Sequence, residues 1–442
     1  MQSVTFGLRG FLIDAPEFGA LRGRANGAVL IENGRIAQVG DYDDLRRLRG
    51  DVRWIDRRPA AIFPGLIDCH THLPQYSVVA RGESELLPWL RQHIFPVERD
   101  FTGPKARAEA PLFFRELVRN GTTTVMAYAA IYEDSCDIGF EAARASGVRA
   151  ILGKMMMDIG SYGQLQPKKV LSISLLESER LCRKWHRAEE GRLEYAFSPR
   201  FAVACSEKLM RGAAELAARL GAYLQTHLAE NREELEKVHH LYMGARDYTH
   251  VYEKCGLLTG HTVLGHCIHL NPREIAAIAA AQSSVAHCPS SNLFLGSGLM
   301  KLDQLLKAGI NVGLGSDVAG GPELNMWQVM RAAIEVQKAR SAYEPNLRPL
   351  RPSEAFYLAT QGGARTLGKG KIIGTFDPGK EADLIVVDLA ALLPYPNQNG
   401  LSKLAPEDVL ALCIYRGGPH GNLETYVRGR CVYRAARLTA AQ

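Results

Sequence analysis

Two histidines separated by one residue, His70 and His72, are the first side chains in the chain that could do chemistry. They follow an apolar run from Ala61 to Ile67. Because side chains alternate faces along a strand, both imidazoles point to the same side. Two imidazoles at one strand end can hold a divalent metal ion between them. Since the chain has 13 histidines, the pair alone does not separate a metal site from two polar residues at a strand end.

The elements that must position this pair alternate between strand and helix. Strands are predicted over 61–70, 122–129, 149–158, 193–200, 222–230, 262–270, 283–289 and 311–317. Helices are predicted between most of them, over 104–120, 172–185, 206–220, 231–242 and 271–281. Gly121 and Gly221 follow two of these helices as C-cap glycines do. The alternation predicts an α/β fold, a (β/α)₈ TIM-like barrel.

Both ends of the chain are rich in short strands. Asn33-Gly34 separates two β-rich runs, which is a strong hairpin pattern. Near the other end, 382–388 and 425–433 are typical of strands. We therefore predict a small β-sandwich domain formed by both termini, from residues 1–64 and 371–442. The catalytic barrel is predicted over 65–370.

Polar side chains recur where the predicted barrel strands end. Such barrels place their chemistry at the C-terminal ends of strands. Taken singly, His287 is typical of a hydrogen-bonded structural residue, Asp317 of a helix N-cap and Arg200 of an ion-pair partner. Together they form a set that one fold would bring to one rim. The set comprises His70, His72, Arg200, His227, Glu230, His266, His287 and Asp317.

Four of these residues suit a metal ion. His70, His72 and His227 supply three imidazoles, and Asp317 supplies a carboxylate. This donor set favours a divalent metal such as Zn²⁺, with a coordination position left for water. A metal in such a site lowers the pKa of bound water to roughly 7. The pattern therefore predicts metal-assisted hydrolysis.

Three residues are candidates to manage the proton and the water. Glu230 lies three residues after His227 and can shuttle a proton without binding the metal. His266 and Asp317 can accept hydrogen bonds from the water and orient its attack. We therefore predict Glu230, His266 and Asp317 as the catalytic residues.

The motifs that carry these residues resemble the amidohydrolase superfamily. They are Pro64-Gly-Leu-Ile-Asp-Cys-His-Thr-His72, His227-Leu-Ala-Glu230, Gly265-His266 and Gly315-Ser-Asp317. The β domain built from both termini is similar too. Strand four ends in Ser198-Pro-Arg200 rather than in the lysine that bridges two metals in binuclear members. The resemblance therefore implies one Zn²⁺ per chain, with Fe²⁺ as the alternative.

Further stretches resemble the guanine deaminase branch of that superfamily. Among them are His72-Leu-Pro-Gln75, Phe95-Pro-Val-Glu98, Ser198-Pro-Arg-Phe201, 286–293 and 313–321. The resemblance implies that Gln75 and Arg200 bind the purine with Phe201 beside the ring, and that His227 and Glu230 also face it. The implied reaction converts guanine to xanthine and ammonia. The segment Ile159–Val170 departs from the family pattern and leaves the exact substrate open.

Two alternatives accompany this interpretation. One is a related deaminase or chlorohydrolase that acts on a pterin, an oxidised purine or a triazine. The other is a non-catalytic relative, but such proteins typically lose metal ligands, and all four candidates are present here. A cytidine-deaminase design is excluded because H-x-E and P-C-x-x-C are absent.

Composition limits the partners and the compartment. The net charge of +6 comes from 53 basic and 47 acidic residues that are interspersed. We therefore expect a small purine as partner, with neither nucleic acid nor membrane. The nine cysteines include no C-x-x-C pair, and the N-terminus lacks a signal-peptide pattern. We expect a cytoplasmic protein, and the resemblance implies a homodimer.

Overall fold

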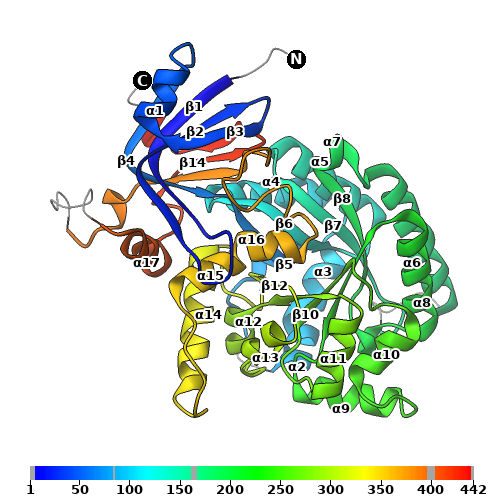
Figure 1. Ribbon diagram of the computed structural model, residues 1–442. Helices are drawn as coiled ribbons and strands as arrows, with labels where there is room; N and C mark the ends of the chain where they lie inside the picture. The colour runs from blue at the N-terminus through cyan, green and yellow to red at the C-terminus, as the bar shows by residue number, and fades with distance from the viewer. Residues whose placement is uncertain (1–4, 83–84, 161–166, 396–403, 440–442) are drawn as a thin grey trace. The chain divides into compact units, whose positions relative to one another are not determined.

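The chain is described by a computed structural model that covers residues 5–82, 85–160, 167–395 and 404–439. It divides into two compact units. The first combines residues 1–68, 115–124 and 324–442, and the second combines 69–114 and 125–323. Both are shown in Figure 1. The first unit confirms that segments from both ends of the chain fold together.

The first unit contains a seven-stranded mixed sheet. Its order is β15-β14-β13-β4-β1-β2-β3. The bounds are β1 Thr5–Asp14, β2 Arg22–Glu32, β3 Arg35–Asp41, β4 Trp54–Pro64, β13 Leu384–Val387, β14 Asn422–Val427 and β15 Arg430–Arg434. The β1–β4 pair is parallel, whereas β1–β2 and β2–β3 are antiparallel. Asn33 and Gly34 have φ angles of 50° and 78°, as the two-residue hairpin turn requires.

An eight-stranded sheet forms the predicted barrel. Its strands run in sequence order from β5 to β12. The bounds are β5 Leu66–His72, β6 Thr122–Ala129, β7 Arg149–Met156, β8 Leu193–Pro199, β9 Tyr223–Leu228, β10 Thr262–His266, β11 Ser284–His287 and β12 Val312–Leu314. Every neighbouring pair from β7 to β12 is parallel. Each strand is buried throughout, because such a sheet is covered on both faces.

The predicted strand over 61–70 is in fact two strands. β4 ends at Pro64 and β5 begins at Leu66, so the chain leaves one sheet and enters the other at Gly65. A Cβ atom at Gly65 would lie 2.1 Å from Oγ1 of Thr123. Glycine is therefore required by close approach. The break coincides with the turn-like pair Pro64-Gly65 and with the predicted domain boundary at 64/65, although the predicted strand itself runs through it.

Helices follow most barrel strands, and five match the predicted segments closely. These are α4 Gly103–Arg119, α6 Pro167–Trp185, α8 Glu207–Leu220, α9 Arg232–Leu241 and α11 Pro272–Ala280. Gly221 ends α8 with a left-handed φ of 64°. Asn231 and Asn271 begin α9 and α11 with capping boxes. Figure 1 shows α5, α6, α8, α10 and α11 ranged around the outside of the strands.

The remaining helical elements are shorter or follow the barrel. They are α1 Tyr42–Leu48, η1 Leu73–Val78, α2 Leu86–Trp89, η2 Leu90–Ile94, α3 Phe95–Asp100, α5 Glu133–Ser146, α7 Ala188–Gly191, η3 Ala202–Ala204, α10 Tyr248–Cys255, α12 Pro289–Phe294, α13 Leu302–Lys307, α14 Met326–Ser341, α15 Pro352–Leu358, α16 Gln361–Thr366, η4 Ala390–Leu392, α17 Pro406–Arg416 and α18 Ala436–Thr439. Of these, η2 is a π-helical turn between α2 and α3.

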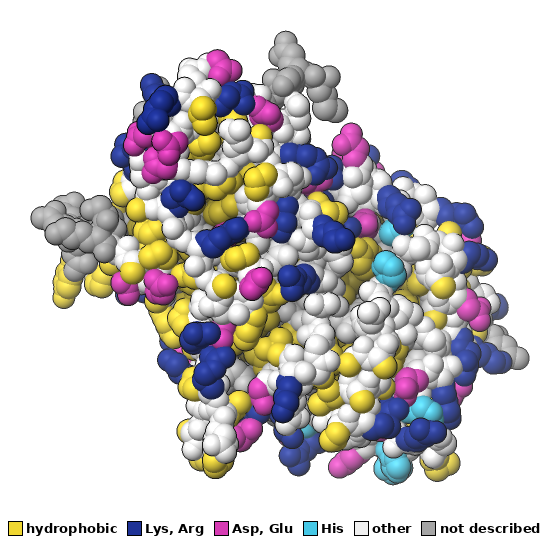
Figure 2. All heavy atoms as spheres, in the orientation of Figure 1, with side chains coloured by type: hydrophobic (Ala, Val, Ile, Leu, Met, Phe, Trp, Pro, Cys, Tyr) yellow, Lys and Arg dark blue, Asp and Glu magenta, His cyan; other side chains and the backbone are white. Residues whose placement is uncertain are grey.

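The surface carries mixed charge. Figure 2 shows basic and acidic side chains intermixed over the visible face, with apolar patches between them. Within the described ranges, no helix combines the length and the hydropathy that a bilayer crossing needs.

Candidate active site

The site lies in the second unit, where the last barrel strand meets the first. The backbone N–H of Asp317 donates a 2.8 Å hydrogen bond to the carbonyl of His70. This contact brings the end of β12 to the end of β5. Asp317, His266 and Ala229 have left-handed φ angles of 48°, 67° and 51°. Such conformations in non-glycine residues cluster at functional sites, because the surrounding fold must hold them in place.

The four predicted metal ligands lie close together in the structure, as their positions at strand ends led us to expect. Nε2 of His70 and Nε2 of His72 each lie 3.2 Å from Oδ1 of Asp317. Nε2 of His72 is also 3.2 Å from Nε2 of His227. Tetrahedral zinc with bonds of about 2.0–2.1 Å separates its ligand atoms by roughly 3.3 Å. The donor atoms therefore have the spacing that one metal ion needs.

Hydrogen bonds set which ring nitrogen faces the site. Nδ1 of His227 lies 2.7 Å from the carbonyl of Arg200, and Nδ1 of His266 lies 2.9 Å from Oδ1 of Asn292. Each Nδ1–H donates to its oxygen, which leaves the Nε2 lone pair directed inward. This orientation by an outer acceptor is typical of metal-binding imidazoles.

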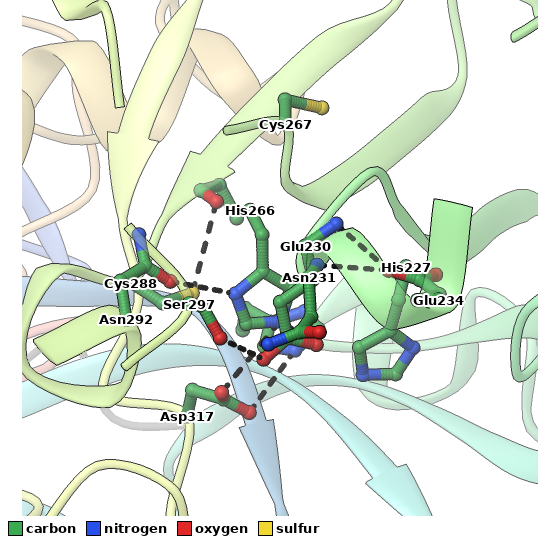
Figure 3. A network of polar contacts seen from close by, with 12 residues as sticks. His227, Glu230, Asn231, Glu234, His266, Cys267, Cys288, Asn292, Ser297 and Asp317 are labelled. Atoms are coloured by element: carbon green, nitrogen blue, oxygen red, sulfur yellow. Dashed lines mark hydrogen bonds and ion pairs between the residues drawn. The ribbon is translucent and has the colours of Figure 1, made fainter. Parts of the chain in front are cut away.

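His266 also belongs to the cluster. The donor atoms of His70, His227, His266 and Asp317 all lie within 4.8 Å of one another. Nε2 of His266 is 3.4 Å from Oε2 of Glu230 and 3.6 Å from Oδ2 of Asp317. Figure 3 shows these side chains pointing toward one another. His266 thus lies beside both a predicted metal ligand, Asp317, and the predicted proton shuttle, Glu230.

Burial sets the charge of these groups. It lowers the pKa of His72 to about 4 and, together with neighbouring imidazoles, that of His227 well below its usual value. Both rings are therefore neutral at pH 7, which is the form that binds metals. Burial would raise the pKa of Asp317, but hydrogen bonds from His70 and His72, with electrostatic contributions from His70 and His266, hold it well below its usual range. Asp317 is therefore a carboxylate.

Glu230 is held by a buried network of its own. The carboxylate of Glu234 accepts hydrogen bonds from the backbone N–H groups of Glu230 at 2.8 Å and Asn231 at 3.2 Å. The hydroxyl of Tyr248 donates to the other oxygen of Glu234 at 2.7 Å. Ser297 Oγ lies 3.4 Å from Oε1 of Glu230. Burial, then the charges of Asp317 and Glu234, raises the pKa of Glu230 well above its usual value.

A pocket opens on this cluster. Its lining combines three of the predicted metal ligands and Glu230 with Gln75, Arg200 and Phe201. The lining residues are His72, Gln75, Leu86, Trp89, Leu90, Arg200, Phe201, His227, Glu230, His266, Leu295 and Asp317. A pocket with apolar walls and a few convergent polar groups suits a small flat ligand.

The structure also reveals residues that sequence reasoning did not assign. Glu98 is fully buried and contacts both Gln75 and Arg200. Leu86, Trp89 and Leu90 form an apolar wall. The only sequence signal for Glu98 was its place in the family-like stretch 95–98, because nothing in its spacing connects it to residues a hundred positions away.

Two sequence features lie away from the lining. His287 is buried at the end of β11 but does not line the pocket. Half of the divergent segment 159–170 lies outside the described residues, namely 161–166; Ile159 before the gap is exposed, and 167–170 begin α6.

Comparison with known proteins agrees with this geometry. The model of the amidohydrolase family matches residues 61–417, and an imidazolonepropionase-like composite domain matches 27–48. Guanine deaminase of Escherichia coli (strain K12) is 37% identical over 95% of this chain and 94% of its own length. Guanine deaminase of Homo sapiens is 36% identical over 84% and 82%. The crystal structure of guanine deaminase from C. acetobutylicum with bound guanine has a TM-score of 0.90, with 30% identity over 97% of this chain and all of that one.

Proposed function

We propose that this chain, which belongs to the amidohydrolase family, hydrolyses guanine to xanthine and ammonia at a single Zn²⁺ ion. The observation that carries the proposal is the convergence of four imidazoles and two carboxylates beside a pocket that Gln75 and Arg200 also line. The choice of guanine as the substrate rests on the similarity of this chain to guanine deaminases.

The metal would be held by His70, His72, His227 and Asp317. Their donor atoms are 3.2 Å apart in three pairs, and a neutral imidazole and an ionised carboxylate are the forms that bind. When bound, Zn²⁺ lowers the pKa of its water to about 7 and so supplies a nucleophile at neutral pH. Fe²⁺ is the alternative metal, because imidazole nitrogen suits both ions.

The protein residues control the water and its proton. Asp317 and His266 accept hydrogen bonds from the water and direct it at C2 of the purine, the carbon that bears the amine. Glu230 takes the proton that the water loses and delivers it to ring N3. The hydroxyl now on C2 gives up its own proton, which reaches the amine; the C2–N bond breaks, the C2 carbonyl forms and ammonia leaves. The raised pKa of Glu230 suits this role, because surroundings that favour its protonated form help it to take a proton from the water and then pass it on.

The far end of the pocket orients the ring. Arg200 has donors only, so it complements a carbonyl oxygen such as O6 of guanine. Gln75 binds a second polar edge, and Phe201, buried beside His227 with ring centroids 6.5 Å apart, lies against the ring. Holding the ring at two polar edges fixes C2 toward the metal end.

A substrate screen tests the proposal. Purified protein loaded with Zn²⁺ is incubated with guanine, adenine, a pterin and a triazine, and ammonia release is measured. We expect guanine to be the best substrate, with xanthine formed in equal amount. Turnover of a pterin or a triazine without turnover of guanine would contradict the proposed substrate and favour the alternative deaminase or chlorohydrolase.

The remaining features of the proposal concern the chain as a whole. We assign the catalytic barrel to 65–370 and the β domain to 1–64 and 371–442. We also propose a cytoplasmic homodimer. The nine cysteines, which all lie in the described part of the chain, form no disulfide there, and this supports a reducing compartment. The dimer is supported by the resemblance to the family.

A further inference from the structure

Glu98 is a buried carboxylate outside the pocket that contacts two residues inside it. Its side chain is 0% exposed, and it does not line the pocket. One carboxylate oxygen accepts a 2.7 Å hydrogen bond from Nε2 of Gln75. The other lies 2.5 Å from Nη1 of Arg200. A charged group this deeply buried requires compensation, and Arg200 supplies it.

The contacts of Gln75 leave its amide a single orientation. Its Nε2 donates to Glu98, and its Oε1 accepts a 3.0 Å hydrogen bond from the backbone N–H of Ala319. Rotating the amide by half a turn would place oxygen against carboxylate and N–H against N–H. Glu98 and Ala319 therefore decide which groups Gln75 offers to a ligand.

Arg200 is fixed from several directions. Its guanidinium pairs with Glu98 and lies 5.0 Å from the ring centroid of Phe95, a cation–π distance. Its backbone carbonyl accepts the hydrogen bond from Nδ1 of His227. The side chain thus serves the ligand end of the pocket, while the main chain serves the metal end. Removing the side chain should leave the metal site unchanged.

A π-helical turn delivers Glu98 to this position. The turn η2 lies between α2, which carries Leu86 and Trp89 of the pocket wall, and α3, which carries Phe95 and Glu98. π-Helical turns are rare in proteins overall, and many of those that do occur lie at functional sites. One short helical segment therefore supplies both the apolar wall and the carboxylate behind the polar end.

We propose that Glu98 is a positioning residue for purine recognition, which fixes the Gln75 amide and the Arg200 guanidinium so that the site accepts a neutral 6-oxopurine. The proposal rests on the proposed function, because that function assigns Gln75 and Arg200 to the purine. The Glu98 carboxylate also neutralises Arg200, which matches the ligand end to an uncharged ring.

A double-mutant cycle tests the proposal. Glu98→Gln, Arg200→Ala and the double variant are compared with wild type by kcat/KM for guanine and by metal content. We expect E98Q to lower kcat/KM by about 10- to 100-fold, the worth of one hydrogen bond to a charged group. In the R200A background, E98Q should change kcat/KM by less than about threefold, because the guanidinium that Glu98 holds is gone and the amide oxygen of the new glutamine can still accept from Gln75. Equal losses in both backgrounds, or wild-type activity of E98Q, would overturn the proposal.

Controls separate this role from stability and from the proposed function. Glu274→Gln removes another buried carboxylate, one that caps α11 and contacts Thr249, and should lower Tm without changing kcat/KM. If E98Q loses metal or structure, Glu98→Asp is used in its place. Aspartate keeps the charge but is too short to reach both Gln75 and Arg200. Wild-type activity of E98D would overturn the proposal. The same set of variants is also made in a Glu230→Gln background, in which guanine should bind without being turned over. There the measured quantity is the Kd for guanine, followed by the fluorescence of Trp89. A wild type that releases no ammonia from guanine refutes the proposed function, while this Kd cycle still decides the role of Glu98.

Discussion

Replacing Glu230 by glutamine tests the proton shuttle most cleanly, because glutamine has the same size and should keep the geometry. The amide oxygen can still accept from Ser297, whose Oγ lies 3.4 Å from Oε1. The other side-chain atom faces Nε2 of His266 at 3.4 Å, where an amide N–H can donate. The backbone N–H of Glu230 remains on Glu234. The substitution therefore leaves no buried polar group without a partner.

Stability should not fall. Burial and then the charges of Asp317 and Glu234 raise the pKa of Glu230 in the folded protein. An acid whose pKa is raised by folding destabilises the folded state above that pKa, where it must be ionised. Removing the charge should therefore leave Tm unchanged or higher. The metal ligands are untouched, so metal content should also stay at the wild-type level.

Activity should nevertheless fall by about 10²- to 10⁴-fold in kcat, because an amide cannot accept and return a proton. At roughly 1.4 kcal/mol per factor of ten, the loss corresponds to about 3–5.5 kcal/mol of the barrier. Ammonia release at saturating guanine measures kcat, and elemental analysis measures the metal. The exposed neighbour Glu233, changed to glutamine, is the matched control and should behave as wild type. Activity of E230Q within a few-fold of wild type, with full metal content, would refute the shuttle.

Three further substitutions probe other parts of the site and fold. Arg200→Ala should reduce kcat/KM for guanine by at least about tenfold, since a hydrogen bond to a charged group contributes about 1.5–3 kcal/mol. Metal content should stay unchanged, because the backbone carbonyl of residue 200 that orients His227 is retained. Metal loss in elemental analysis would contradict this. Asn292→Leu removes the acceptor of the Nδ1–H of His266, 2.9 Å away, and should lower activity by about 10- to 100-fold; an unchanged kcat would show that this imidazole needs no outer partner. Gly65→Ala forces a methyl group against Thr123, 2.1 Å from its Oγ1, and should lower the free energy of unfolding by about 1–3 kcal/mol in denaturant titrations; wild-type stability would mean that the strand junction adapts at no cost.

The convergence of the candidate metal ligands could be predicted from sequence, because these residues stand at fixed places in a repetitive fold. The pair His70 and His72 needs only strand alternation to share a face. His227 and Asp317 need only a barrel that brings strand ends to one rim. The hydrogen bond from Asp317 N–H to the His70 carbonyl shows how directly the last strand meets the first.

The second layer of the site could not be predicted in the same way. Glu98 reaches Arg200 across 102 positions of sequence, and its helix contains a π-helical turn that no apolar periodicity indicates. Gly65 divides what looked like one strand because of a close approach to Thr123, a tertiary contact. Motifs at strand ends are local, whereas the groups that orient them depend on packing between distant segments.

Titrating metal-free protein with Zn²⁺ while recording guanine deamination tests the central claim most directly. The protein is stripped with a chelator, and ammonia release is measured after each addition. One site built from His70, His72, His227 and Asp317 predicts that activity rises linearly and stops rising at one equivalent per chain. Activity that continues to rise to two equivalents, or that survives removal of all metal, would contradict the account.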